Sequence, residues 1–158
     1  MNRGTRSRDR VKQTGKGKSH SFLRLPHFLT DSEEFGALRP PAVKLLVEIA
    51  RQFRGSNNGD LSVPWKLLKR RGWASEWTVK RARDELLTAG FIRKTRHGLR
   101  KMCHLYAITW EPINECPGKL LEIDEETVAS HAWRKHVLNC HHSSRETVST
   151  ATTAVKAA

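Results

Sequence analysis

Five side chains that can donate hydrogen bonds, accept them or stack on a flat ring occur close together between residues 75 and 90. They are Trp77, Thr78, Lys80, Arg81 and Asp84. Lysine and arginine can donate to N7 and O6 of guanine, and threonine can meet a thymine methyl group or a phosphate. The set therefore favours a helix that reads bases in the major groove of DNA. An ordinary solvated surface helix is the open alternative.

A helix over residues 75–89 is needed to present these side chains, and the pattern predicts one. Ser75 is a suitable N-cap, because its hydroxyl can accept a backbone N–H of the first turn. Gly90 supplies the left-handed conformation that ends a helix. The apolar residues recur at helical spacing and share a separate face; they are Val79, Ala82, Leu86 and Ala89. This thin apolar face predicts a helix that docks on a core.

A second helix is expected just before the first, with Ser62 as its N-cap and Gly72 after its last residue. A helix, a short glycine-containing turn and another helix follow each other in the helix-turn-helix motif. Cations on the earlier helix, with Ser75, are placed to bind backbone phosphates, which gives affinity without reading sequence. These cations are Lys66, Lys69, Arg70 and Arg71.

A hairpin is expected after Gly90, because the apolar period changes from helical to alternating. Its strands are predicted over residues 91–96 and 102–110, joined by a basic turn at residues 97–101. Three cations near the tip can reach a minor groove or a phosphate: Arg96, Arg100 and Lys101. Leu61, upstream of the two helices, is expected to make a short strand contact.

The scaffold before these elements is expected to be helical. Residues 42–53 predict a strong amphipathic helix. Its apolar stripe consists of Leu46, Ile49, Ala50 and Phe53. A shorter helix, capped by Thr30 or Asp31 and reaching Leu38, should precede it. Residues 22–29 contain Pro26, so they predict an extended lead-in.

Together these segments resemble a known family. Residues 38–112 look like a winged helix-turn-helix domain, and the runs LPHFLTDSEEFGAL, AVKLLVEIARQFRGSNNGDLS, GWASEWTVKRARDELLTAGFIRKTR and LYAITWEPI resemble small proteins of bacterial prophages and plasmids. The resemblance implies an α+β fold with a three-helix core and a β-hairpin wing. It also implies binding of double-stranded DNA by a transcription regulator or a replication-initiation protein.

Charge supports a polyanionic partner. The chain carries a formal net charge of +13. Residues 1–20 hold seven Lys or Arg against one Asp, and residues 61–101 hold twelve against three acids, counted from the sequence. The expected organisation is a disordered basic arm at 1–20, a DNA-binding domain at 21–112, a linker and amphipathic helix at 113–142, and a disordered tail at 143–158.

The composition favours a cytoplasmic, nucleoid-associated protein. The three cysteines are an odd number, which favours a reducing compartment. No apolar run approaches the length of a membrane span, and residues 1–20 lack the hydrophobic centre of a secretory signal. The histidines and cysteines near the end lack zinc-site spacing: His131, His136, Cys140, His141 and His142. No metal, no small-molecule cofactor and no catalytic residue is expected.

Two other functional classes stay open. The helix expected at residues 125–138 could pack on the domain, form a homodimer or bind a replication or transcription partner, which allows a protein-interaction module. The five tryptophans allow a protein that binds single-stranded DNA or RNA, because bases stack on indoles. Core packing is the expected role of Trp65, Trp73 and Trp110, and Trp77 is the exception.

Overall fold

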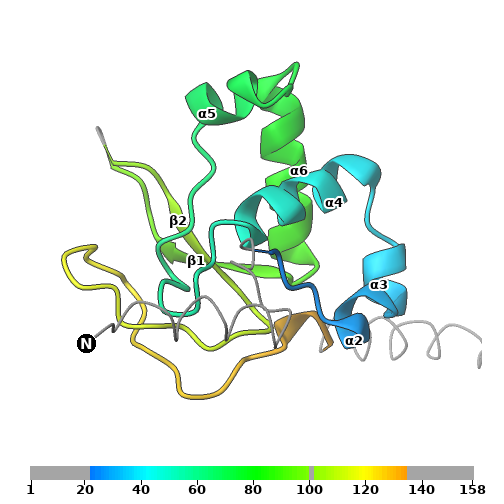
Figure 1. Cartoon of the computed structure of the whole chain (residues 1–158). Helices are drawn as coiled ribbons and strands as arrows, with labels where there is room; N and C mark the ends of the chain where they lie inside the picture. The colour runs from blue at the N-terminus through cyan, green and yellow to red at the C-terminus, as the bar shows by residue number, and fades with distance from the viewer. Residues whose placement is uncertain (1–21, 100–101, 135–158) are drawn as a thin grey trace, which may run out of the picture.

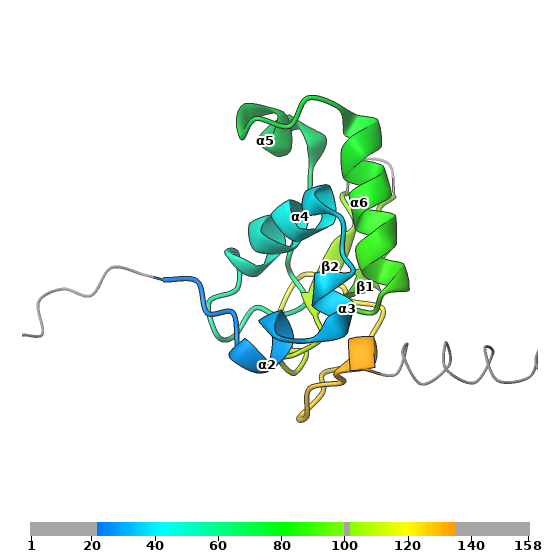
Figure 2. The same ribbon diagram turned by 90° about the vertical axis from the view of Figure 1, so that its right-hand side faces the viewer.

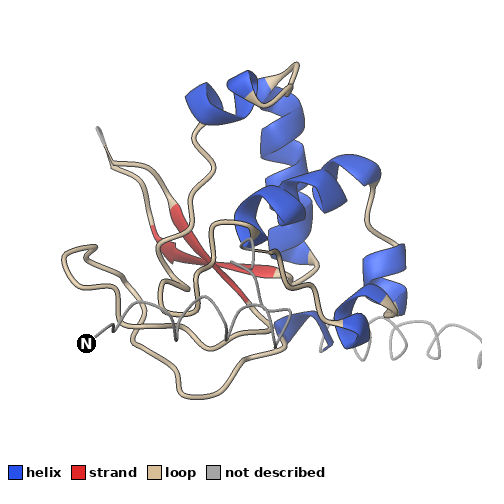
Figure 3. Ribbon diagram, viewed as in Figure 1, coloured by secondary structure: helices blue, strands red, loops and turns tan. Residues whose placement is uncertain are grey.

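The computed structural model describes residues 22–99 and 102–134. The elements in chain order are α2 (His27–Thr30), α3 (Glu33–Gly36), α4 (Pro40–Ala50), α5 (Trp65–Arg70), α6 (Glu76–Thr88), β1 (Ile92–Arg96) and β2 (Leu105–Ile108). The fold is α+β, as predicted, with helices gathered on one side of an antiparallel strand pair (Figures 1 and 3). No helix in these described ranges is long and apolar enough to cross a membrane.

The scaffold helix α4 begins earlier and ends earlier than the pattern predicts. Pro40 and Pro41 occupy its first turn, where a missing N–H costs nothing. One face of α4 is fully buried, including Leu45, Leu46 and Ile49. Upstream, α3 is capped by the Ser32 hydroxyl, which accepts from the N–H of Phe35. The predicted caps at Thr30 and Asp31 were therefore wrong.

Helices α5 and α6 occur where they were expected, but their predicted hydroxyl caps do not form. Ser62 is not the cap of α5: its N–H donates to Gln52 and its carbonyl accepts from Gln52, so Pro64 stands at the N-cap instead. Ser75 occupies the N-cap position of α6, yet its side chain makes no capping hydrogen bond.

Helix α6 stops at a glycine for two physical reasons. Gly90 has φ of +76°, a left-handed conformation that disfavours any side chain. A Cβ added there would also lie 2.8 Å from the backbone of Ala132 and of Trp133. Residues 132 and 133 of the C-terminal segment therefore pack directly against the end of α6.

The hairpin has the predicted position with shorter strands. β1 and β2 pair antiparallel, with Ile92 opposite Ile108 and an irregularity between Lys94 and Arg96. Leu61 forms the expected bridge on the other edge, exchanging both backbone hydrogen bonds with Tyr106. All four residues of β2 are buried.

The helix predicted over residues 125–138 was wrong for residues 125–131, which form no helix. Only residues 132–134 are helical, and residues 135–138 lie outside the described chain. Backbone N–H groups between residues 122 and 131 bond to the hairpin region instead: those of Glu122 and His131 donate to the carbonyls of Thr95 and Thr109. The segment runs as a long loop beneath the strands (Figure 1).

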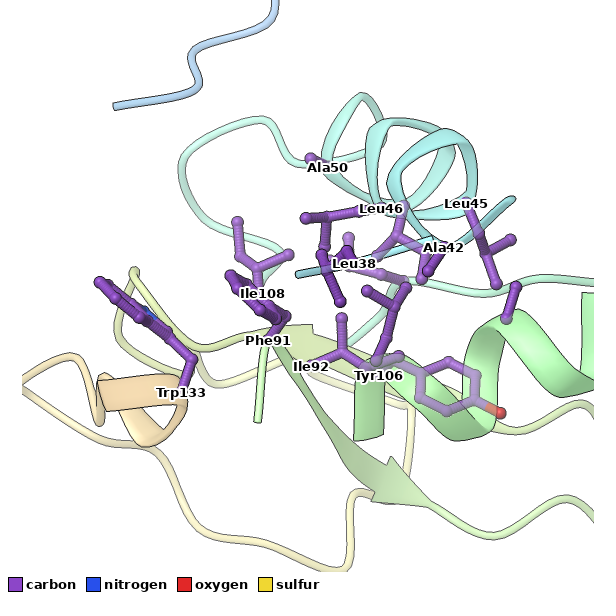
Figure 4. Close-up of a cluster of buried hydrophobic side chains, with 14 of the residues drawn as sticks. Leu38, Ala42, Leu45, Leu46, Ala50, Phe91, Ile92, Tyr106, Ile108 and Trp133 are labelled. Atoms are coloured by element: carbon purple, nitrogen blue, oxygen red, sulfur yellow. The ribbon is translucent and has the colours of Figure 1, made fainter. Parts of the chain in front are cut away.

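The core lies between α4, α6 and the hairpin. Leu46, Phe91 and Tyr106 are completely buried there (Figure 4). Trp133 joins the same cluster and stacks on Phe91, with ring centroids 5.8 Å apart and planes 5° from parallel. The segment after residue 112 thus packs back on the core, which is one of the three roles considered for it.

Candidate nucleic-acid interface

Helix α5 and the start of α6 project together at one end of the molecule, away from α2 and α3 (Figures 1 and 2). On α5, Lys66, Lys69 and Arg70 are all exposed. None of the three forms an ion pair with another residue of the described chain. Three positive charges are thus presented to solvent from little more than one helical turn.

Arg71 does not join them. Its Nε lies 2.6 Å from a carboxylate oxygen of Glu48 on α4, and Glu48 is buried. Arg51 also approaches this carboxylate, at 3.5 Å. A charge buried at this depth requires a partner, so Arg71 holds α5 to α4 instead of extending freely from α5 as predicted.

The exposed face of α6 carries an aromatic–cation pair. Trp77 is 65% exposed, and the guanidinium carbon of Arg81 lies 5.2 Å from its ring centroid. The two residues are one helical turn apart, which is the spacing at which side chains meet on a helix surface. Lys80 lies beside them and is exposed, while Thr78 is half-buried. Lys80 and Arg81 form no ion pair within the described residues.

Asp84, also predicted as a base contact, is engaged by its neighbour Arg83. Nε and Nη2 of Arg83 donate to Oδ1 of Asp84 at 3.0 and 2.7 Å. Burial is the largest single influence and lowers the pKa of the Arg83 guanidinium, but the bonds to Asp84, the Asp84 charge and the neighbouring Tyr106 hydroxyl together outweigh burial and raise this pKa. The Asp84 side chain stays 52% exposed, so its second oxygen remains open to solvent.

Helix α6 is held on the core by its apolar face and by one polar residue on its flank. Val79, Ala82 and Leu86 are buried against the scaffold, as the apolar spacing predicts. On the flank, Glu85 accepts from the backbone N–H of Arg39 and from its Nε, both at 2.8 Å. The carboxylate therefore satisfies the start of α4 and holds the two helices together.

The turn between α5 and α6 is anchored by Trp73, for which core packing was predicted, and by Lys44, which the pattern did not single out for this role. Trp73 is buried in the turn, and Nζ of Lys44 lies 4.9 Å from its ring centroid. The same ammonium reaches the carbonyl of Gly72 at 3.5 Å. Lys44 and Glu48 are four residues apart on α4, so one polar face of α4 supports the turn. The four-residue spacing of Lys44 and Glu48 was the sequence signal that could have identified this supporting face of α4.

Of the three cations predicted near the tip of the hairpin, the structure describes one. Arg96 is half-buried and donates to the carbonyls of Lys119 and Cys103 at 2.6 and 3.1 Å. It is thus bound within the protein rather than free at the tip. The other two, Arg100 and Lys101, lie outside the described residues.

The base of the hairpin loop is held by two histidines. His97 Nδ1 lies 2.6 Å from the Glu122 carboxylate, and the backbone N–H of His97 donates to the same side chain at 2.8 Å. The N–H of Gly98 donates to Nδ1 of His104 at 2.9 Å. Burial first, then the nearby charges of Lys94 and Arg83, lower the pKa of His104. A neutral ring is therefore favoured, as an accepting Nδ1 requires.

The described residues contain no group of three or more His, Cys, Asp or Glu side chains that could hold a metal ion. Of the residues near the chain end, His131 is described, and His136, Cys140, His141 and His142 are not. The arrangement on α5 and α6 thus offers charge, hydrogen-bond donors and one exposed indole. These are means of binding an anionic polymer.

Comparisons of the chain with protein-family models, curated proteins and solved structures found no significant match. Function must therefore be inferred from the charges and geometry of α5, α6 and the hairpin.

Proposed function

We propose that this protein binds double-stranded DNA as a winged helix-turn-helix protein. In this proposal α6 enters the major groove, α5 lies over the phosphate backbone, and the β1–β2 hairpin lies alongside as the wing. One observation supports it above all others. Five exposed cations without ion pairs in the described chain share the α5–α6 surface: Lys66, Lys69, Arg70, Lys80 and Arg81.

The order and packing of the elements also favour this class of protein. α5, a turn with Trp73 buried in it, and α6 give two helices on a scaffold helix, and the hairpin follows α6 directly. The contact of Leu61 with Tyr106 adds a short third strand position at the edge of β2. An exposed helix on a rigid support suits groove binding, because its side chains are presented with little reorganisation.

The direct test is the salt dependence of duplex binding. Fluorescence anisotropy with a labelled duplex should show affinity falling linearly with salt on a log–log scale. The double variant Lys69→Gln/Arg70→Gln should reduce the slope by about two, because each lost phosphate contact removes about 0.9. The control is Arg24→Gln/Arg54→Gln, which removes the same charge near the end of α4, where Arg24 pairs with Glu111 at 3.2 Å.

The control pair decides whether the location of charge matters. We expect Arg24→Gln/Arg54→Gln to change the slope by much less than the α5 pair. Equal effects of the two double variants would mean that net charge alone attracts DNA, and they would contradict an interface on α5 and α6. Duplex binding that is insensitive to salt, or absent, would contradict the proposed function itself.

We further propose a role in transcription regulation or replication initiation for a prophage or plasmid, at the nucleoid in the cytoplasm. Selection of bound duplexes from a random pool separates the two roles. A regulator acting as a dimer predicts a palindrome with half-sites one helical turn apart, whereas an initiator predicts repeated sites bound by single copies. The proposal includes a homodimer or a replication or transcription partner bound through residues 125–138; of these, Trp133 is buried in the core and residues 135–138 lie outside the described chain.

The exposed indole of Trp77 favours a second candidate function, binding of single-stranded DNA or RNA by stacking. Against it, Trp73, Trp110 and Trp133 are buried, so they offer no further stacking surface. Competition of unlabelled single strands against a bound duplex distinguishes the two functions. A preference for single strands would replace the duplex proposal.

A further inference from the structure

Arg81 differs from the other cations of α6 in having both a planar donor fork and free donors. Arg83 is half-buried and two of its donors are bound to Asp84. Lys80 is exposed, but an ammonium is a point charge without a fork. No hydrogen bond from Arg81 to another described residue is present, and the residue is exposed. Arg81 is therefore the side chain on α6 best able to make a paired contact.

Trp77 gives Arg81 a defined place. The guanidinium carbon sits 5.2 Å from the indole centroid, within the range of a cation–π contact. Such a contact uses the face of the guanidinium, so its N–H groups at the edge stay available. A side chain that is already held also loses less rotamer freedom when it binds. The contact thus orders Arg81 without consuming its donors.

We propose that Trp77 and Arg81 act as one unit that selects DNA sites with a guanine in the major groove opposite α6. This inference rests on the proposed duplex binding and names what the helix reads. Arg81 donates to N7 and O6 of the guanine, which is the pair of acceptors that an arginine fork matches. Trp77 is a positioning residue that acts through Arg81.

The experiment uses the full chain and the duplex that wild type selects from a random pool. Each guanine of that duplex is replaced in turn by 7-deazaguanine, which lacks the N7 acceptor. For wild type, replacement at one position should weaken binding by about 5- to 150-fold. In Arg81→Ala the same replacement should have no effect, because the donor fork is gone. Both residues are exposed, so circular dichroism should show unchanged folding.

Two substitutions at residue 77 separate positioning from simple contact. Trp77→Leu should reduce the guanine preference by about 2- to 13-fold, because Arg81 must then be ordered on binding. Trp77→Phe should keep most of the preference, because a phenyl face also holds a guanidinium. The readout is the ratio of affinities for the guanine duplex and for its 7-deazaguanine counterpart, because this ratio isolates the Arg81 contact from any contact that residue 77 itself makes with DNA.

The outcomes that would overturn the inference are specific. A 7-deazaguanine penalty that survives in Arg81→Ala assigns guanine reading to another residue. A full penalty in Trp77→Leu, or a uniform loss on every duplex, removes the positioning role. If wild type binds duplexes and no position depends on guanine, the proposed guanine reading by Trp77 and Arg81 is wrong, but the proposed duplex binding stands. If wild type binds no duplex in a salt-dependent way, the proposed function fails first.

Discussion

Arg71 Nε lies 2.6 Å from the carboxylate of Glu48, so the last cation of the α5 region is bound to α4. Glu48 is buried, and its other basic contact, Arg51, is more distant at 3.5 Å. The pair joins residues 23 positions apart and ties the end of α5 to α4. Two adjacent arginines, Arg70 and Arg71, therefore differ in role.

Substitution of Arg71 should reduce the free energy of unfolding much more than substitution of Arg70. Arg71→Gln leaves the Glu48 carboxylate with only Arg51, so we expect a loss of about 1–2 kcal/mol in the free energy of unfolding. Arg70→Gln removes an exposed charge and should change stability by less than about 0.5 kcal/mol. Urea denaturation followed by circular dichroism measures both.

For the salt dependence of DNA binding, Arg70→Gln should have the larger effect and Arg71→Gln the smaller. Arg70→Gln should lower the salt slope by about one, and Arg71→Gln should leave the slope unchanged once folding is confirmed. Glu48→Gln serves as the control for the pair, because it removes the other partner and should destabilise without changing the slope. Equal stability of the two arginine variants would show that the Glu48 contact contributes nothing.

Periodic segments account for what could be predicted. The spacing of Val79, Ala82 and Leu86 gave α6 to within one residue at each end, because a helix that buries one face repeats its apolar residues. Gly90 marked the helix end correctly, because glycine readily adopts the left-handed conformation that ends a helix. The hairpin strands followed from alternation, and Leu61 from its isolated position before α5.

The remaining features depend on partners distant in the chain. Local patterns misplaced residues 125–131, for which they predicted a helix, because the N–H groups of Glu122 and His131 bond instead to carbonyls in the hairpin region. Arg71 and Arg96 look like free surface cations, and only their acceptors at Glu48, Cys103 and Lys119 show otherwise. The exposure of the candidate side chains was therefore better predicted on α6 than at the end of α5 and in the hairpin.

Asn58 should be among the most sensitive polar residues of the fold. Its buried amide donates to the carbonyls of Ile108, Glu111 and Pro112, each at 2.9 Å, and its Oδ1 accepts from the N–H of Ile108 at 2.8 Å. Asn58→Ala leaves these groups unpaired, and we expect a loss of about 2–4 kcal/mol in unfolding free energy. Chemical denaturation measures it.

Ser56→Ala is the matched control for this substitution. Ser56 lies in the same turn and is exposed, so its loss should change stability by less than about 0.5 kcal/mol. An Asn58→Ala protein as stable as this control would mean that water replaces the amide at no cost.

The stacked ring of Trp133 predicts that the C-terminal part of the described chain is needed for stability. Trp133 is 2% exposed and lies between Phe91 and Phe28, at centroid distances of 5.8 and 6.5 Å. Trp133→Ala should cost about 3–5 kcal/mol, as large aromatic truncations in a core do. Val128→Ala, at a residue 75% exposed, is the control and should be nearly neutral. Equal melting temperatures of the two variants would place Trp133 outside the core.

Acidification should loosen the hairpin loop through His104. Burial, followed by the charges of Lys94 and Arg83, lowers the pKa of His104 below its ordinary 6.5. Above pH 6.5 the ring is neutral in both folded and unfolded chains, so it changes nothing. As the pH falls below 6.5 the unfolded chain takes up the proton first, and stability decreases. Protonation of the folded ring then removes the acceptor of the Gly98 N–H.

Glu122 acts in the same direction at lower pH. The hydrogen bond from the His97 side chain, followed by that from its backbone N–H, lowers the pKa of Glu122 below 4.5. Its contribution is present above pH 4.5 and is lost as the pH falls through the folded-state pKa.

Nuclear magnetic resonance titration should show His104 changing below pH 6.5 together with the Gly98 amide. The Gly98 change should vanish in His104→Gln, and a His104 pKa at or above 6.5 would refute this account of the loop.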